Sequence, residues 1–128
     1  MDPVTVIVTA LAAGASTGAI GALKDDAAQA AKAAYAKLRG LAGRRVAGQP
    51  HGELALQEHQ AAPQKWEGLL TAELTEAGAA GDADLVAAAE ALLALIDPAG
   101  ARAGKYQVTL SGAQGVQVGD GNVQINRF

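Results

Sequence analysis

The chain changes its residue pattern near Gly104, and this change constrains the fold more than any other feature. Before it, alanine is frequent and apolar residues recur at helical spacing. After it, alanine nearly disappears and apolar side chains alternate, as in strands, over residues 106–110, 116–118 and 123–125. We therefore expect an all-α, alanine-rich bundle over residues 1–98, a linker over 99–105 and a β-forming tail over 106–128.

The helical part predicts a small bundle of four to five helices. The predicted segments are 4–23, 25–43 and 52–61, then one that begins at Pro63, and one that begins at Asp82 or Asp84 and stops before Pro98. Leu54 is the expected apolar anchor of the third segment. With one Trp, one Phe and two Tyr, the core must consist of Leu, Val, Ile and Ala.

The first segment is a run of residues without a single charge, from Val4 to Leu23. Its length would let a helix span a bilayer core of about 30 Å. Small residues Gly14, Gly18 and Ala22, four apart, would allow close helix approach. A buried core helix and a helix that enters the membrane on activation both fit. The candidate membrane-helix residues are Val4, Val6, Ile7, Val8, Leu11, Gly14, Gly18, Ile20 and Leu23. Asp2 is the only charge before the run, which argues against a secretory signal.

Composition argues against an enzyme and against a nucleic-acid-binding protein. The chain has no cysteine and a net charge of −3, and phosphate binding needs clustered Lys and Arg. His51 and His59 are eight residues apart without a third ligand, so we expect both to be exposed. Asp120-Gly121-Asn122 fits a turn better than a calcium loop. No catalytic, cofactor-binding or metal-binding residue is predicted, and no small-molecule substrate.

Charge is distributed unevenly along the helical part. Residues 24–45 carry a net charge of +4, and residues 53–97 carry a net charge of −8. Helices of opposite sign could attract each other within the bundle. Alternatively, the basic segment could bind anionic lipid with an acidic partner masking it. The sequence leaves both open.

The tail contains two near-copies of one short unit, Val116-Gln117-Val118 and Val123-Gln124-Ile125, joined through Gly119. A hairpin would pair the two units within one molecule. A β-arch would leave the backbone free to pair with identical chains, with apolar residues forming a dry zipper and amides forming ladders. The candidate assembly residues are Val116, Gln117, Val118, Gly119, Asn122, Val123, Gln124, Ile125 and Asn126.

Val116-Gln117-Val118-Gly119, followed after two residues by Asn122, resembles the core of the RIP homotypic interaction motif (RHIM). That motif drives amyloid-type assembly of necroptosis kinases. The usual pattern continues to a Met where this chain has Gln124, a departure shared by RHIM-like bacterial amyloid signalling sequences. The resemblance covers roughly the last 12 to 20 residues.

The helical part also carries a set of short segments in a recognisable order: Asp2-Pro3-Val4, Trp66, Ala91-Leu92-Leu93-Ala94-Leu95 and Ala103-Gly104-Lys105-Tyr106. In these segments it is similar to the Bell domains of actinobacterial proteins and to the HET-s-like and HeLo-like domains of fungi. It implies a cell-death effector whose tail is templated by a nucleotide-sensing, NLR-type receptor and whose first helix then targets the membrane.

The expected partners are other copies of the chain, the NLR-type receptor and the inner membrane. The expected location is the cytoplasm, with movement to the plasma membrane on activation. An adaptor without a membrane step and a plain structural oligomer are the alternatives.

Overall fold

The computed structural model describes residues 2–106, apart from the side chains of residues 17 and 18. Within that range all regular structure is helical: α1 (Pro3–Ala15), α2 (Thr17–Gly21), α3 (Asp25–Val46), α4 (Gly52–Ala61), α5 (Pro63–Glu76), the 3-10 turn η1 (Ala79–Gly81), α6 (Ala83–Ile96) and α7 (Pro98–Arg102). The all-α prediction is confirmed. Helices α3 to α6 correspond to the later four predicted segments. Helices α1 and α2 divide the first predicted segment between them, and α7 is a short addition. The predicted tail beyond Tyr106 lies outside the described residues.

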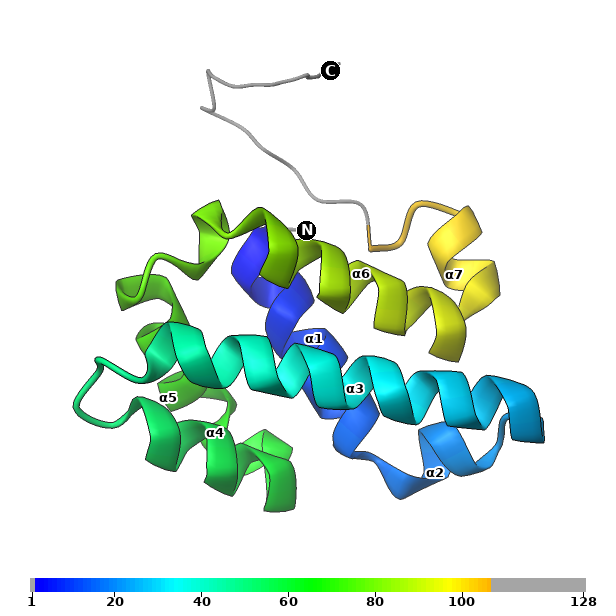
Figure 1. Cartoon of the computed structure of the whole chain (residues 1–128), viewed down its shortest axis with the longest axis horizontal. Helices are drawn as coiled ribbons and strands as arrows, with labels where there is room; N and C mark the ends of the chain where they lie inside the picture. Colours follow the sequence, from blue (N-terminus) through cyan, green and yellow to red (C-terminus); the bar gives the residue numbers. More distant parts are fainter. Residues whose placement is uncertain (1, 107–128) are drawn as a thin grey trace.

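Helix α1 lies at the centre of the bundle. It runs behind the long helix α3 and crosses it steeply, with α6 on one side and the α4–α5 pair on the other (Figure 1). Its most extensive contacts are with α6, followed by α5 and α3. The core is made of small and branched aliphatic side chains, and its largest fully buried members include Ile7, Leu11, Leu38, Leu74 and Leu92.

Local signals in the sequence explain where the later helices begin. Pro63 occupies the first turn of α5, where a missing N–H is tolerated. Of the two predicted caps, Asp82 caps α6, because its Oδ1 accepts from the Leu85 N–H at 3.1 Å. Pro98 follows the end of α6 and also begins α7. The first part of the predicted 99–105 linker is therefore helical.

Two expectations for the third segment are wrong. Leu54 is 48% exposed, whereas Ala55 and Leu56 beside it are buried. His59, expected to be exposed, is only 1% exposed. Both errors have one cause: α4 is short and carries adjacent apolar residues, so spacing alone does not choose its inner face. The neighbouring helices cover the side that carries Leu56 and His59.

Candidate functional site

The best candidate for a functional element is α1, because it is both uncharged and enclosed by other helices. Asp2 caps its start: Oδ1 accepts from the Thr5 N–H at 3.0 Å, and Oδ2 accepts from the Thr5 hydroxyl at 2.7 Å. These hydrogen bonds lower the pKa of Asp2. Pro3 stands in the first turn, where its fixed φ suits a helix. The start of the uncharged run is thus well defined.

The predicted membrane-helix residues are divided among α1, α2 and the segment after them. Those in α1 have buried side chains: Val4, Val6, Ile7, Val8 and Leu11. Gly14 lies in the last turn of α1, Gly18 and Ile20 lie in α2, and Leu23 follows α2.

The expected single helix over residues 4–23 is therefore wrong, and the break is at Ser16. Ser16 has an extended backbone, with φ −78° and ψ 115°. Its hydroxyl accepts from the Ala19 N–H at 3.4 Å, so a residue that ends α1 also caps the next turn. The expected Gly14, Gly18 and Ala22 ridge does not run along one helix. Among residues 2–106, no helix is both long and apolar enough to cross a membrane.

At Gly14, α1 lies directly against the ring of Tyr35 on α3. A Cβ atom built on Gly14 would lie 2.8 Å from Cγ and 2.9 Å from Cε1 of Tyr35, which is far inside van der Waals contact. The Tyr35 ring therefore covers the end of α1, and only glycine leaves room for it. The burial of this ring raises the pKa of Tyr35.

Two recesses lie beside α1. A groove of about 530 Å³ opens at the break, with Ser16, Asp25 and Lys32 among its lining residues. A smaller recess of about 190 Å³ lies between α1 and α5, and its polar residues include Thr9 and Glu67. The second recess shows that α1 has a polar side as well as its buried apolar side.

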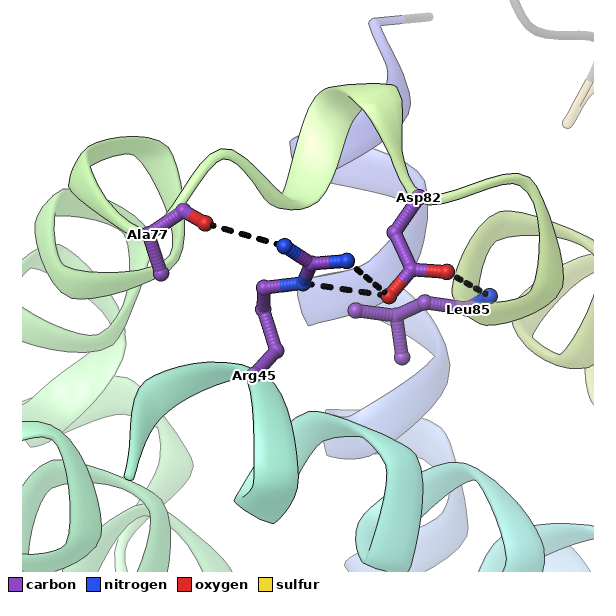
Figure 2. A network of polar contacts seen from close by, with 4 residues as sticks. All are labelled: Arg45, Ala77, Asp82 and Leu85. Atoms are coloured by element: carbon purple, nitrogen blue, oxygen red, sulfur yellow. Dashed lines mark hydrogen bonds and ion pairs between the residues drawn. The ribbon is translucent and has the colours of Figure 1, made fainter. Parts of the chain in front are cut away.

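The two oppositely charged segments meet at Arg45 and Asp82 (Figure 2). Nη2 and Nε of Arg45 donate to Oδ2 of Asp82 at 2.8 and 3.1 Å, and Nη1 donates to the Ala77 carbonyl at 3.4 Å. Hydrogen bonding to Arg45 and to Leu85 lowers the pKa of Asp82. This pair joins the end of α3 to the start of α6, as the intramolecular interpretation of the charge pattern predicts.

Further basic side chains on α3 face solvent. Lys32, Lys37 and Arg44 are exposed. The bundle therefore presents cations at its surface as well as the Arg45 ion pair, and the lipid-binding interpretation of the basic segment stays a prediction.

His59 is a buried polar residue that sequence reasoning missed. Its Nε2 has no hydrogen-bond partner among the described residues. Burial lowers the pKa of His59, and the carboxylate of Glu67 on α5 partly opposes that effect. His59 follows the buried residues Ala55 and Leu56 by four and three positions, and this helical spacing is the signal that could have indicated its burial.

Residues 2–106 contain no group of three or more His, Cys, Asp or Glu side chains that could hold a metal ion. The candidate assembly residues between Val116 and Asn126 lie outside the described range, so their conformation stays a prediction.

Comparison with known proteins places the chain in a family. The sequence matches the family model of the Het-E N-terminal domain over residues 1–128. No curated protein and no solved structure matches the chain. The match supports the HeLo-like N-terminal helical domain that the sequence indicates, a kind of domain consistent with cell death or signalling. The chain belongs to the Het-E N-terminal domain family.

Proposed function

We propose that the chain is a non-enzymatic effector of amyloid-controlled cell death. A receptor of the NLR type, bearing a similar motif, templates the tail into a cross-β assembly, and the helical domain then acts on the inner membrane from the cytoplasm. The observation that carries the proposal is the enclosure of the uncharged helix α1 within a domain of this family. The tail adds the doubled unit around Val116-Gln117-Val118 and Val123-Gln124-Ile125.

The energetics of α1 set a condition on this mechanism. Five large aliphatic side chains of α1 are buried, and each stabilises the fold by about 1.5–3 kcal/mol. Their sum of about 8–15 kcal/mol is comparable to the whole stability of a small domain, about 5–15 kcal/mol. Withdrawal of α1 is therefore equivalent to unfolding the bundle. Assembly must bring many bundles to one membrane site, where lipid replaces the lost core.

The same observation favours a second candidate, an adaptor. If α1 stays in the core, the folded bundle serves as a protein-binding module, and the tail co-assembles it with a receptor or protease. No membrane step is then needed. The two candidates make different demands on α1 once the tail assembles. A membrane effector needs an α1 without charge, because α1 must enter lipid, whereas an adaptor does not.

A Thr9→Lys variant distinguishes the two candidates. Thr9 borders the recess that contains Glu67, so a lysine there has a carboxylate partner and the bundle should stay folded. A charge on α1 opposes insertion into lipid. The matched control is Thr9→Val, which keeps the helix uncharged. A charged residue at Gly14 would be less informative, because it would collide with Tyr35.

The assay is dye leakage from phosphatidylethanolamine–phosphatidylglycerol vesicles, with assembled full-length protein. A membrane effector should lose leakage in Thr9→Lys and keep it in Thr9→Val. Equal leakage from both variants would contradict membrane action by α1. Replacing Val116-Gln117-Val118-Gly119 with four alanines tests whether the tail controls the effector. Vesicle leakage should be lost in this variant, and leakage that persists would contradict the proposal.

A further inference from the structure

The last described residues fold back onto the bundle instead of leading directly away from it. The Tyr106 hydroxyl donates to Oδ2 of Asp97 at 2.7 Å. Nζ of Lys105 lies 3.6 Å from the same oxygen and 5.3 Å from the centre of the Tyr106 ring. Hydrogen bonds to a carboxylate are stronger than those between neutral groups. The root of the tail is therefore held at the junction of α6 and α7.

Asp97 also holds α7. Its second oxygen, Oδ1, accepts from the Gly100 N–H at 3.1 Å and caps that helix. After α7, Gly104 adopts a positive φ of 81°, and the Lys105 N–H donates to the Gly100 carbonyl at 2.9 Å. This left-handed turn, which suits glycine, returns the chain to Asp97. One carboxylate thus ties together the cap of α7 and the root of the tail.

The junction is connected to α1 through α6. Tyr106 packs against the edge of the core, and Tyr106, Glu90 and Ala94 line one recess beside α6 and α7. Helix α7 lies beside the end of α6 (Figure 1). Since α6 is the main packing partner of α1, the tail root and α1 share one neighbour.

Tyr106 also belongs to the predicted β-forming tail, where it begins the alternating run Tyr106, Val108 and Leu110. A strand that starts at Tyr106 needs an extended backbone there and a side chain placed by the assembly. The bundle instead needs Tyr106 at Asp97. Tyr106 held at Asp97 is not free to enter such a strand, so we expect the two states to compete.

We propose that the Asp97–Tyr106 contact is an autoinhibitory latch that holds the root of the tail on the bundle and slows its entry into the assembly. The proposal rests on the proposed function, and it names the contact that regulates it. Opening the latch frees Tyr106 for the strand and removes a constraint on α7 and the end of α6.

Two variants open the latch by different means. Tyr106→Phe removes the hydroxyl and keeps the ring. Asp97→Asn keeps an oxygen that can cap α7 at Gly100 and replaces the oxygen that accepts from Tyr106 by an amide nitrogen, so the charge-assisted hydrogen bond is lost and only a weaker neutral one, from Nδ2 to the Tyr106 hydroxyl oxygen, can take its place. Tyr35→Phe is the matched control, because it removes the hydroxyl of the chain's other tyrosine.

The first measurement is amide hydrogen exchange of residues 103–105 in the monomeric full-length protein. Loss of one charge-assisted hydrogen bond should accelerate exchange by about five- to tenfold in both latch variants and leave the control unchanged. Unchanged exchange in the latch variants would overturn the proposal, whatever happens during assembly.

The second measurement is the lag time before thioflavin-positive assembly of the same full-length proteins. We expect the lag to shorten severalfold in both latch variants. If wild type assembles and the variants have the same lag, the latch is overturned while the proposed function stands. If neither wild type nor any variant assembles, the proposed function is overturned, and the inhibitory role of the latch with it. Assembly of the variants alone would support the latch.

Discussion

The contact between Gly14 and Tyr35 yields the sharpest stability prediction. In Gly14→Ala, the added Cβ would lie within 3 Å of the Tyr35 ring, since Cγ is 2.8 Å and Cε1 is 2.9 Å away. Overpacking of this kind costs about 1–3 kcal/mol. The better helix propensity of alanine offsets up to about 1 kcal/mol. We expect Gly14→Ala to lower the free energy of unfolding by about 0.5–2 kcal/mol.

The sign of the effect should reverse when the ring is removed. In a Tyr35→Ala background the overlap is absent, so Gly14→Ala should raise the free energy of unfolding by about 0.5–1 kcal/mol. Because Tyr35 is only partly buried, its truncation should leave the bundle folded. Urea unfolding of the four proteins, followed by far-UV circular dichroism, gives the full cycle. A Gly14→Ala effect of equal size and sign in both backgrounds would refute the close approach of α1 and α3.

Three further predictions follow from burial and charge. Leu11→Ala should destabilise the bundle by about 2–5 kcal/mol in urea unfolding, whereas Leu54→Ala, at an exposed position, should change it by less than about 0.5 kcal/mol. Asp82→Ala removes a helix cap and an ion-pair partner and should cost about 1–2 kcal/mol, with much of the loss recovered in Asp82→Asn, which still caps. The pKa of His59 is lowered by burial from its usual 6.5, so the unfolded state binds the proton more tightly and stability should fall as the pH drops below 6.5. Replacing His59 by Gln should flatten this pH dependence in thermal melts, and an unchanged dependence in that variant would contradict the role of His59.

Local chemistry made much of the fold predictable. Proline is favoured in the first turn of a helix and aspartate at its N-cap, so Pro63 predicted the start of α5, and the choice between Asp82 and Asp84 predicted the start of α6 to within two residues. The uncharged run similarly predicted a helix suited to burial, which is α1.

The wrong predictions concern positions where local sequence signals conflict, or where only the packing of neighbouring helices determines which side chains are buried. Ser16 separates α1 from α2, and its hydroxyl accepts from the Ala19 N–H. No charged residue or proline marks this break in the sequence. Leu54 and Leu56 are equally apolar, so only the positions of the neighbouring helices decide that the first is exposed and the second buried. The Asp97–Tyr106 contact joins residues nine apart across a turn, and periodicity does not encode such a contact.

Hydrogen exchange of the helices around α1 in the full-length protein, measured as the monomer and again after tail assembly in the presence of vesicles, tests the account most directly. In the monomer, α3, α5 and α6 should be protected, because they pack against α1. The account predicts that release of α1 into lipid opens the bundle, so that α3, α5 and α6 of Thr9→Val exchange at least tenfold faster after assembly, whereas Thr9→Lys, whose α1 cannot enter lipid, keeps its monomer protection in these helices. If α3, α5 and α6 keep their monomer protection in assembled Thr9→Val, the bundle remains closed, and the proposed release of α1 is contradicted.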